Sequence, residues 1–124
     1  MLLSIIAPTF NEAENIKTLI SSISKVVVNI DYEIIFVDDN SQDKTYEIIK
    51  NIAKKNKKIR CLRRIGRRGL SSAVIEGALS SSSTFLLVMD SDLQHDEKKI
   101  PAMLRLLKEK DLDIVIGSRF LKKK

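Results

Sequence analysis

Cysteine occurs once in the 124 residues, at Cys61, so no disulfide can form within the chain. A reducing, cytosolic setting is therefore expected, with Cys61 as an ordinary structural residue. The apolar runs are too short to cross a bilayer, and no charged segment precedes an apolar stretch at the start of the sequence. The sequence predicts neither a membrane-spanning helix nor a signal peptide.

Two nucleotide-binding motifs are also absent. No GxGxxG follows the first apolar run, where APTFNE stands instead, and GxxxxGK[ST] occurs nowhere in the sequence. Dinucleotide-dependent oxidoreductases and P-loop enzymes therefore lose their best sequence support.

The composition is that of one globular domain, covering residues 1–124, because 44% of the residues are hydrophobic. The net charge of +6 is spread unevenly. Nine basic residues form what we call the basic stretch: Lys54, Lys55, Lys57, Lys58, Arg60, Arg63, Arg64, Arg67 and Arg68. Such a stretch suits phosphates, anionic lipid head groups or nucleic acid, and equally a solvated surface without a partner.

Two hydrophobic periods alternate along the chain. Short apolar runs rich in Ile and Val predict strands at 2–8, 32–38, 59–63, 84–90 and 112–117. Between them, apolar residues spaced three and four apart predict helices over 16–27, 46–53, 70–77 and 100–107. This alternation predicts an α/β fold with a mostly parallel, Rossmann-like sheet between two helical layers. Ligands of such folds bind outside the carboxyl ends of the strands.

Polar residues follow four of the five expected strands. They lie at 8–12, 38–41, 90–92 and 117–119. Because the carboxyl ends of parallel strands meet at one edge, we expect a functional site there. Ser41 and Asp43 have a simpler expected role as caps of the second helix.

The stretch LLVMDSDLQHD holds the strongest signal for a metal ion. In an extended chain, Asp90, Asp92 and Gln94 would point to the same side, and the two carboxylates would repel each other without a cation. Clustered oxygen ligands favour Mg²⁺ or Mn²⁺, which keep open positions for phosphate oxygens. Arg119, at a neighbouring strand end, would offer its guanidinium to the same phosphates. The lone histidine, His95, is a minor candidate.

Five stretches together resemble the ordered motifs of family 2 inverting glycosyltransferases, which have the GT-A fold. They are PTFNE (8–12), VDDNSQDKT (37–45), GRRGLSSAVIEGAL (66–79), VMDSDLQH (88–95) and GSRF (117–120). The sequence is most similar to dolichyl-phosphate mannose synthases and related polyprenyl-phosphate glycosyltransferases. This resemblance covers the whole chain.

The resemblance implies a role for each site residue. Pro8, Phe10, Glu12 and Asp39 would hold the nucleoside, with Asp39 reading the base. Asp90 and Asp92 would serve the ribose and the metal-bound diphosphate, Gln94 would help bind the metal, and Arg119 would contact the donor phosphates. Asp90, Asp92 and Arg119 are the residues expected to support catalysis.

The implied reaction transfers a hexose, with mannose favoured, from a nucleoside-diphosphate sugar to a polyprenyl (dolichyl) phosphate. It depends on Mg²⁺ or Mn²⁺ and inverts the anomeric centre. GDP-mannose and UDP-glucose both stay open as donors. The expected location is the cytoplasmic face of a membrane, through peripheral contact or a membrane subunit. Nucleic acid is not an expected partner, and homo-oligomer formation is left open.

The sequence also departs from the family pattern. Phe10 stands where Tyr is frequent, Ser71–Ser72 replaces a glycine-containing pair, and Asp96 replaces a frequent proline. The family domain continues beyond GSRF, so we expect chiefly the donor portion, truncated after the fifth strand. A nucleotide-sugar-binding module without turnover is the alternative. A phosphoacceptor receiver domain ranks third, because the acidic pair ends the second expected strand and no lysine follows the fifth.

Overall fold

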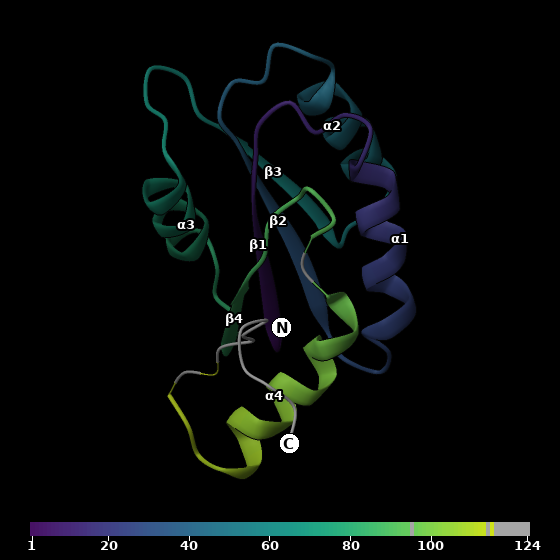
Figure 1. Cartoon of the computed structure of the whole chain (residues 1–124), viewed down its shortest axis with the longest axis vertical. Helices are drawn as coiled ribbons and strands as arrows, with labels where there is room; N and C mark the ends of the chain where they lie inside the picture. The colour runs from purple at the N-terminus through teal and green to yellow at the C-terminus, as the bar shows by residue number, and fades with distance from the viewer. Residues whose placement is uncertain (95, 114, 116–124) are drawn as a thin grey trace.

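The computed structural model describes residues 1–94, 96–113 and 115. In these residues, four parallel strands form one sheet in the order β3-β2-β1-β4 (Figure 1). The strands are β1 (Leu3–Thr9), β2 (Tyr32–Asp38), β3 (Ile59–Arg63) and β4 (Phe85–Val88). The predicted parallel α/β fold is confirmed.

Helices connect consecutive strands, as the sequence predicted. They are α1 (Ile16–Val26), α2 (Thr45–Lys55), α3 (Leu70–Leu79) and α4 (Ile100–Glu109), and a 3-10 turn, η1 (Glu97–Lys99), precedes α4. Of the fifth expected strand, Leu112, Asp113 and Val115 are described and none of them is in a strand. The rest of that segment, including Arg119, lies outside the described residues, as does His95.

Alternation of side chains along the strands divides the core between the two faces of the sheet. Ile5 and Phe36 belong to a large cluster with residues of α1, α2 and α4, whereas Ile6 and Val37 pack with Ala73 of α3. Figure 1 shows α3 alone on its side of the sheet, opposite α1 and α2. Because β2 is buried on both faces, its sequence reads as a continuous apolar run rather than an alternating one.

Helix α3 approaches the sheet closely at Gly77. A Cβ atom at this position would lie 2.6 Å from Cγ2 of Ile6 and 3.1 Å from Cγ2 of Val37. Glycine therefore sets the distance between α3 and the sheet, although it is a poor helix former.

A polar cluster around the buried side chains of Ser4 and Glu33 lies between the end of α3 and the sheet. Ser4 donates a hydrogen bond to Glu33 (Oγ to Oε2, 2.6 Å), and Arg60 donates to the same carboxylate (Nε to Oε1, 2.7 Å). The hydroxyls of Ser81 and Ser83 lie 2.7 and 2.6 Å from that of Ser4. The serine-rich segment after α3 is thus held to the sheet by side-chain hydrogen bonds.

The basic stretch does not form one surface. Lys54 and Lys55 end α2, and Lys57 and Lys58 precede β3, so these lysines lie at the amino-terminal edge of the sheet. Residues 63–68 follow β3 at the opposite edge, where the candidate site is expected. In the described part of the chain, no helix combines the length and apolar character needed to cross a membrane.

Replacing Gly77 with alanine tests the close approach of α3. Alanine normally favours a helix over glycine, but here its methyl group collides with Ile6, so we expect Gly77→Ala to lower the free energy of unfolding by about 1–3 kcal/mol. Urea denaturation measures the change. Ser71→Ala, on the exposed surface of the same helix, is the control and should have a small effect. Unchanged or increased stability of Gly77→Ala would contradict the packing described.

Candidate functional site

The loops that follow β1 and β2 are joined by side-chain hydrogen bonds. Asn11, whose φ is 52°, donates its N–H to Oγ of Ser41 (2.9 Å), and its Oδ1 accepts from the N–H of Gln42 (2.9 Å). Ser41 in turn donates both its hydroxyl and its N–H to the carboxylate of Asp38. The expectation that Ser41 caps α2 is therefore wrong, because Ser41 joins two strand ends instead; the N-cap of α2 is Lys44.

Glu12 lies in the same joined pair of loops. Its N–H donates to Oγ1 of Thr45 (2.9 Å), and its carboxylate accepts a hydrogen bond from the Asn15 side chain (Oε2 to Nδ2, 2.7 Å). Asp43 accepts from the N–H groups of Thr45 (2.9 Å) and Ala13 (3.3 Å). The start of α2 and the loop after β1 are thus fixed relative to each other.

The loop after β4 is anchored by Ser91. This side chain is buried, with its Oγ 2.8 Å from Oγ1 of Thr9, and it donates to the carbonyl of Pro8 (3.0 Å). The flanking residues Asp90 and Asp92 are half-buried. The hydroxyl of Ser91 therefore attaches the acidic segment to the end of β1.

The chain does not continue as a strand through the acidic segment. β4 ends at Val88, residues 91–93 form a bend, and Leu93 has a φ of 67°. The N–H of Gln94 donates to Oδ1 of Asp92 (3.1 Å). The extended geometry from which we inferred the convergence of Asp90, Asp92 and Gln94 is therefore absent here, and their convergence stays a prediction.

The side chains near this bend offer oxygen atoms, which suit a hard metal cation. Carboxylate and amide oxygens, without imidazole or thiolate, are the ligands that Mg²⁺ and Mn²⁺ prefer. In the residues that the structure describes, no three acidic, histidine or cysteine side chains are grouped so that they could hold a metal ion. A metal here would be held by two carboxylates and an amide, with its remaining ligands supplied by phosphate oxygens or water.

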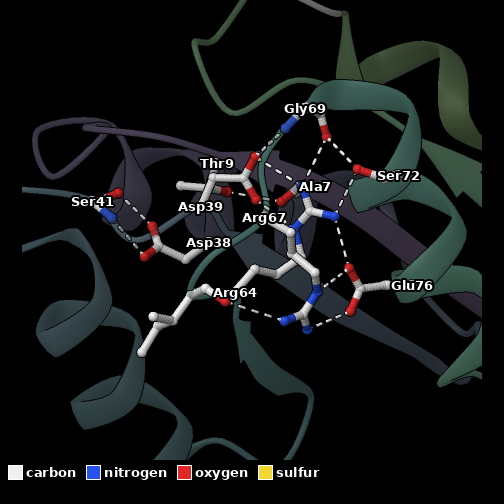
Figure 2. A network of polar contacts seen from close by, with 11 residues as sticks. Ala7, Thr9, Asp38, Asp39, Ser41, Arg64, Arg67, Gly69, Ser72 and Glu76 are labelled. Carbon is white, nitrogen blue, oxygen red and sulfur yellow. Dashed lines mark hydrogen bonds and ion pairs between the residues drawn. The ribbon is translucent and has the colours of Figure 1, made fainter.

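Asp39 belongs to an ion-pair network that is centred on Arg64 and that the sequence did not predict (Figure 2). Val37 of β2 and Leu62 of β3 face α3, where they pack with Ala73. Because side chains alternate along a strand, Asp39 and Arg64, two residues further on, also project toward α3. Arg64 donates from Nε to Oδ1 of Asp39 (2.6 Å) and from Nη2 to Oδ2 (3.0 Å). This fork-to-fork pair is the strongest geometry available to the two groups.

All five N–H groups of the Arg64 guanidinium have partners. Besides Asp39, they reach Oε2 of Glu76 (2.7 Å), Oγ of Ser72 (2.8 Å) and the carbonyl of Gly69 (2.9 Å). These contacts compensate the burial of a charged side chain that is only 1% exposed. The alternation in IRCLRR, which puts Arg60, Leu62 and Arg64 on one face, is the signal that could have found this residue.

The neighbouring arginines lower the pKa values of the Asp39 and Glu76 carboxylates. Burial favours a higher pKa for Asp39, but hydrogen bonds from Arg64 and the Gly69 N–H, with the charges of Arg64 and Arg68, outweigh burial and lower it. Glu76 also accepts two hydrogen bonds from Arg67 (2.7 and 2.9 Å). The hydrogen bonds from Arg67 and Arg64 lower the pKa of Glu76 to about 2.

Phe10 presents an aromatic surface at the same edge. Its side chain is 40% exposed, and the guanidinium carbon of Arg68 lies 5.3 Å from the ring centroid. Pro8 is partly buried at the end of β1. Of the predicted nucleoside-binding residues, Pro8, Phe10 and Glu12 come from β1 and its loop, and Asp39 comes from the end of β2.

Comparison with known protein families shows to which family the chain belongs. The glycosyl transferase family 2 model matches residues 4–124. The chain belongs to glycosyl transferase family 2. The predicted membership is thereby confirmed.

Curated family 2 relatives share much of the sequence. The dolichol-phosphate mannosyltransferase of Pyrococcus furiosus is 42% identical over 98% of this chain, and that of Saccharomyces cerevisiae is 35% identical over 94%. The chain spans 34% and 44% of these two relatives, respectively. A Pyrobaculum calidifontis mannosyltransferase, solved with GDP-Man and Mn²⁺, has the same fold, with a TM-score of 0.74 and 22% sequence identity. The match covers 86% of this chain and 32% of that mannosyltransferase.

The pH dependence of stability tests the contribution of Glu76 to the ion-pair network around Arg64. Glu76 has a pKa of about 2 against an ordinary value of 4.5, so its contribution is complete above about pH 4.5 and is lost as the pH falls toward 2. The lowered pKa of Asp39 acts in the same direction. We expect Glu76→Gln to be less stable than the wild type at pH 7 and to lose less stability on acidification. Urea denaturation at a series of pH values measures this, and parallel curves for the two proteins would contradict the role of Glu76.

Proposed function

We propose that this chain forms the donor-binding part of a metal-dependent inverting glycosyltransferase. The reaction transfers a hexose, with mannose favoured, from a nucleoside-diphosphate sugar to a polyprenyl phosphate such as dolichyl phosphate. One observation carries the proposal: at the carboxyl edge of the sheet, side-chain hydrogen bonds hold the loops after β1 and β2 to each other and the loop after β4 to the end of β1. The 42% identity to a dolichol-phosphate mannosyltransferase supports mannose and a dolichyl phosphate as substrates.

The nucleoside end of the proposed site is formed by Pro8, Phe10, Glu12 and Asp39. The exposed ring of Phe10 offers a surface for a base or ribose, and Asp39 stays ionised because its pKa is lowered. An ionised carboxylate accepts hydrogen bonds from the N–H groups of a base. We assign base reading to Asp39.

The diphosphate end is assigned to the segment after β4. Asp90, Asp92 and Gln94 would supply oxygen ligands for Mg²⁺ or Mn²⁺, and a bound cation would neutralise the charge of the departing diphosphate. The mannosyltransferase of this fold that was solved with GDP-Man and Mn²⁺ supports a divalent metal ion as part of the proposal. Arg119 is assigned to the donor phosphates on the basis of the GSRF motif and lies outside the described residues.

In this reaction the protein would act chiefly by positioning the donor sugar and the acceptor phosphate. A phosphate acceptor is already an anion at neutral pH, so it attacks the anomeric carbon without a general base, and attack from the side opposite the diphosphate inverts that carbon. The protein then orients the donor and stabilises negative charge as the diphosphate leaves. A polyprenyl acceptor places this reaction at a membrane surface, through peripheral contact or a membrane subunit.

A nucleotide-sugar-binding module without turnover is the second candidate. The joined loops at the carboxyl edge support this candidate equally, because they would hold a nucleotide sugar whether or not transfer follows. Both candidates predict donor binding. Incubation with radiolabelled GDP-mannose, or with UDP-glucose, and dolichyl phosphate separates them: label in the organic-extractable lipid supports the transferase, and binding without such label supports the module.

Metal-dependent binding of a nucleoside diphosphate is the first expectation of the proposal. Calorimetric titration should show that GDP or UDP binds in Mn²⁺ or Mg²⁺ and that chelation weakens binding. Asp92→Asn should weaken binding in metal about tenfold, because a ligand carboxylate loses its charge. Asp96→Asn is the matched control, since Asp96 caps η1 and asparagine retains that function. Equal affinity with and without chelator would remove the metal from the proposal.

A further inference from the structure

We propose that Arg64 is a positioning residue for base recognition. It fixes the carboxylate of Asp39 in one orientation, so that selectivity among nucleobases depends on a buried side chain that does not touch the nucleotide. The inference rests on the base-reading role assigned to Asp39 under the proposed function.

The accessibility of the two side chains separates their roles. The Arg64 side chain is 1% exposed, whereas that of Asp39 is 14% exposed at the edge where the nucleoside is assigned. A ligand can therefore reach the carboxylate but not the guanidinium. Arg64 acts on the ligand only through Asp39.

The contacts of Asp39 leave a single acceptor position. Its Oδ2 accepts two hydrogen bonds, from Nη2 of Arg64 (3.0 Å) and the N–H of Gly69 (2.9 Å), and its Oδ1 accepts one, from Nε of Arg64. A carboxylate offers about four lone-pair positions, so the remaining one is on Oδ1. Because Arg64 contacts both oxygens, the carboxylate cannot rotate without breaking a charged hydrogen bond.

One fixed acceptor discriminates between bases. Guanine and uracil present a ring N–H on their Watson–Crick edge, whereas adenine and cytosine present a ring nitrogen acceptor at that position. An acceptor of fixed direction pairs with the first two bases and faces a lone pair in the others. A freely rotating carboxylate would adapt to the exocyclic amino groups of adenine and cytosine, and selectivity would fall.

Gly69 is the second positioning contact. Its φ of 123° directs its N–H at Oδ2 of Asp39 while its carbonyl accepts from Nη2 of Arg64. A side chain at this φ is strained, although a Cβ would meet only the Ser72 hydroxyl at 3.7 Å. Gly69→Ala therefore disturbs the backbone contact without filling a packed space.

A second arginine–carboxylate pair on this face provides a control. Arg60 also uses its fork on a buried carboxylate, donating to Glu33 from Nε (2.7 Å) and Nη2 (3.2 Å). This pair lies earlier along β2 and β3, away from the carboxyl edge. Arg60→Lys changes a similar interaction outside the assigned site.

The experiment measures binding of GDP and ADP, two purine nucleotides, to this chain in Mn²⁺ by calorimetry. The wild type should prefer GDP. Arg64→Lys keeps the charge but loses the fork, and we expect its GDP affinity to fall about tenfold while ADP affinity changes little. Asp39→Asn should lose the preference too, and the double variant Asp39→Asn/Arg64→Lys should bind GDP no more weakly than Asp39→Asn alone. Arg60→Lys should keep the wild-type ratio of affinities.

The outcomes distinguish the inference from the function on which it rests. A wild type that binds neither GDP nor UDP overturns the proposed function, and an unchanged preference in Asp39→Asn overturns base reading by Asp39. A retained GDP preference in Arg64→Lys, or an effect that adds to that of Asp39→Asn, overturns the positioning role alone. Circular dichroism checks folding. If Arg64→Lys does not fold, Gly69→Ala decides, because an unchanged preference in that variant also overturns the inference.

Discussion

A buried guanidinium must be fully hydrogen-bonded, and this requirement at Arg64 organises the carboxyl edge of the sheet. Its five N–H groups draw together the end of β2, the loop at 64–69 and helix α3, through Asp39, Gly69, Ser72 and Glu76. Removing one carboxylate partner would leave charge buried without compensation, which is costly. The proposed base-reading residue is thus part of the structural network as well as of the ligand site, and a substitution at Asp39 acts on both.

The same alternation that buries the apolar core also positions these polar groups. On the α3 face, Glu33 and Arg60 pair near one end of the strands and Asp39 and Arg64 pair just beyond the other, with Ile6, Ile35 and Val37 among the apolar residues of that face. Gly77 lets α3 approach the apolar part closely. Short polar side chains then join the loops after β1 and β2 to each other and the loop after β4 to the end of β1.

Local sequence signals predicted the fold, because the hydrophobic period of each segment and the alternation of strands and helices along the chain require no knowledge of distant contacts. They also predicted a site at the carboxyl edge of the sheet, and that location stays a prediction. The four described strands, the helices between them and the polar strand ends follow from such signals. Partners far apart in sequence could not be read in this way: Ser41 meets Asn11, Ser91 meets Thr9, and Arg64 meets Glu76 only in the folded chain. The positive φ of Leu93 ends the extended geometry assumed for the acidic segment, since a leucine gives no warning of that conformation.

The central claim is that a divalent cation and a nucleoside diphosphate bind together at the carboxyl edge. Paramagnetic broadening of backbone amide signals by Mn²⁺, in the presence of GDP, measures the position of the cation directly. The account predicts strongest broadening at residues 90–94, weaker broadening at Thr9 and Asp39, and none at Lys57 and Lys58 on the opposite edge. Broadening centred elsewhere, or broadening at 90–94 that GDP does not change, would contradict it.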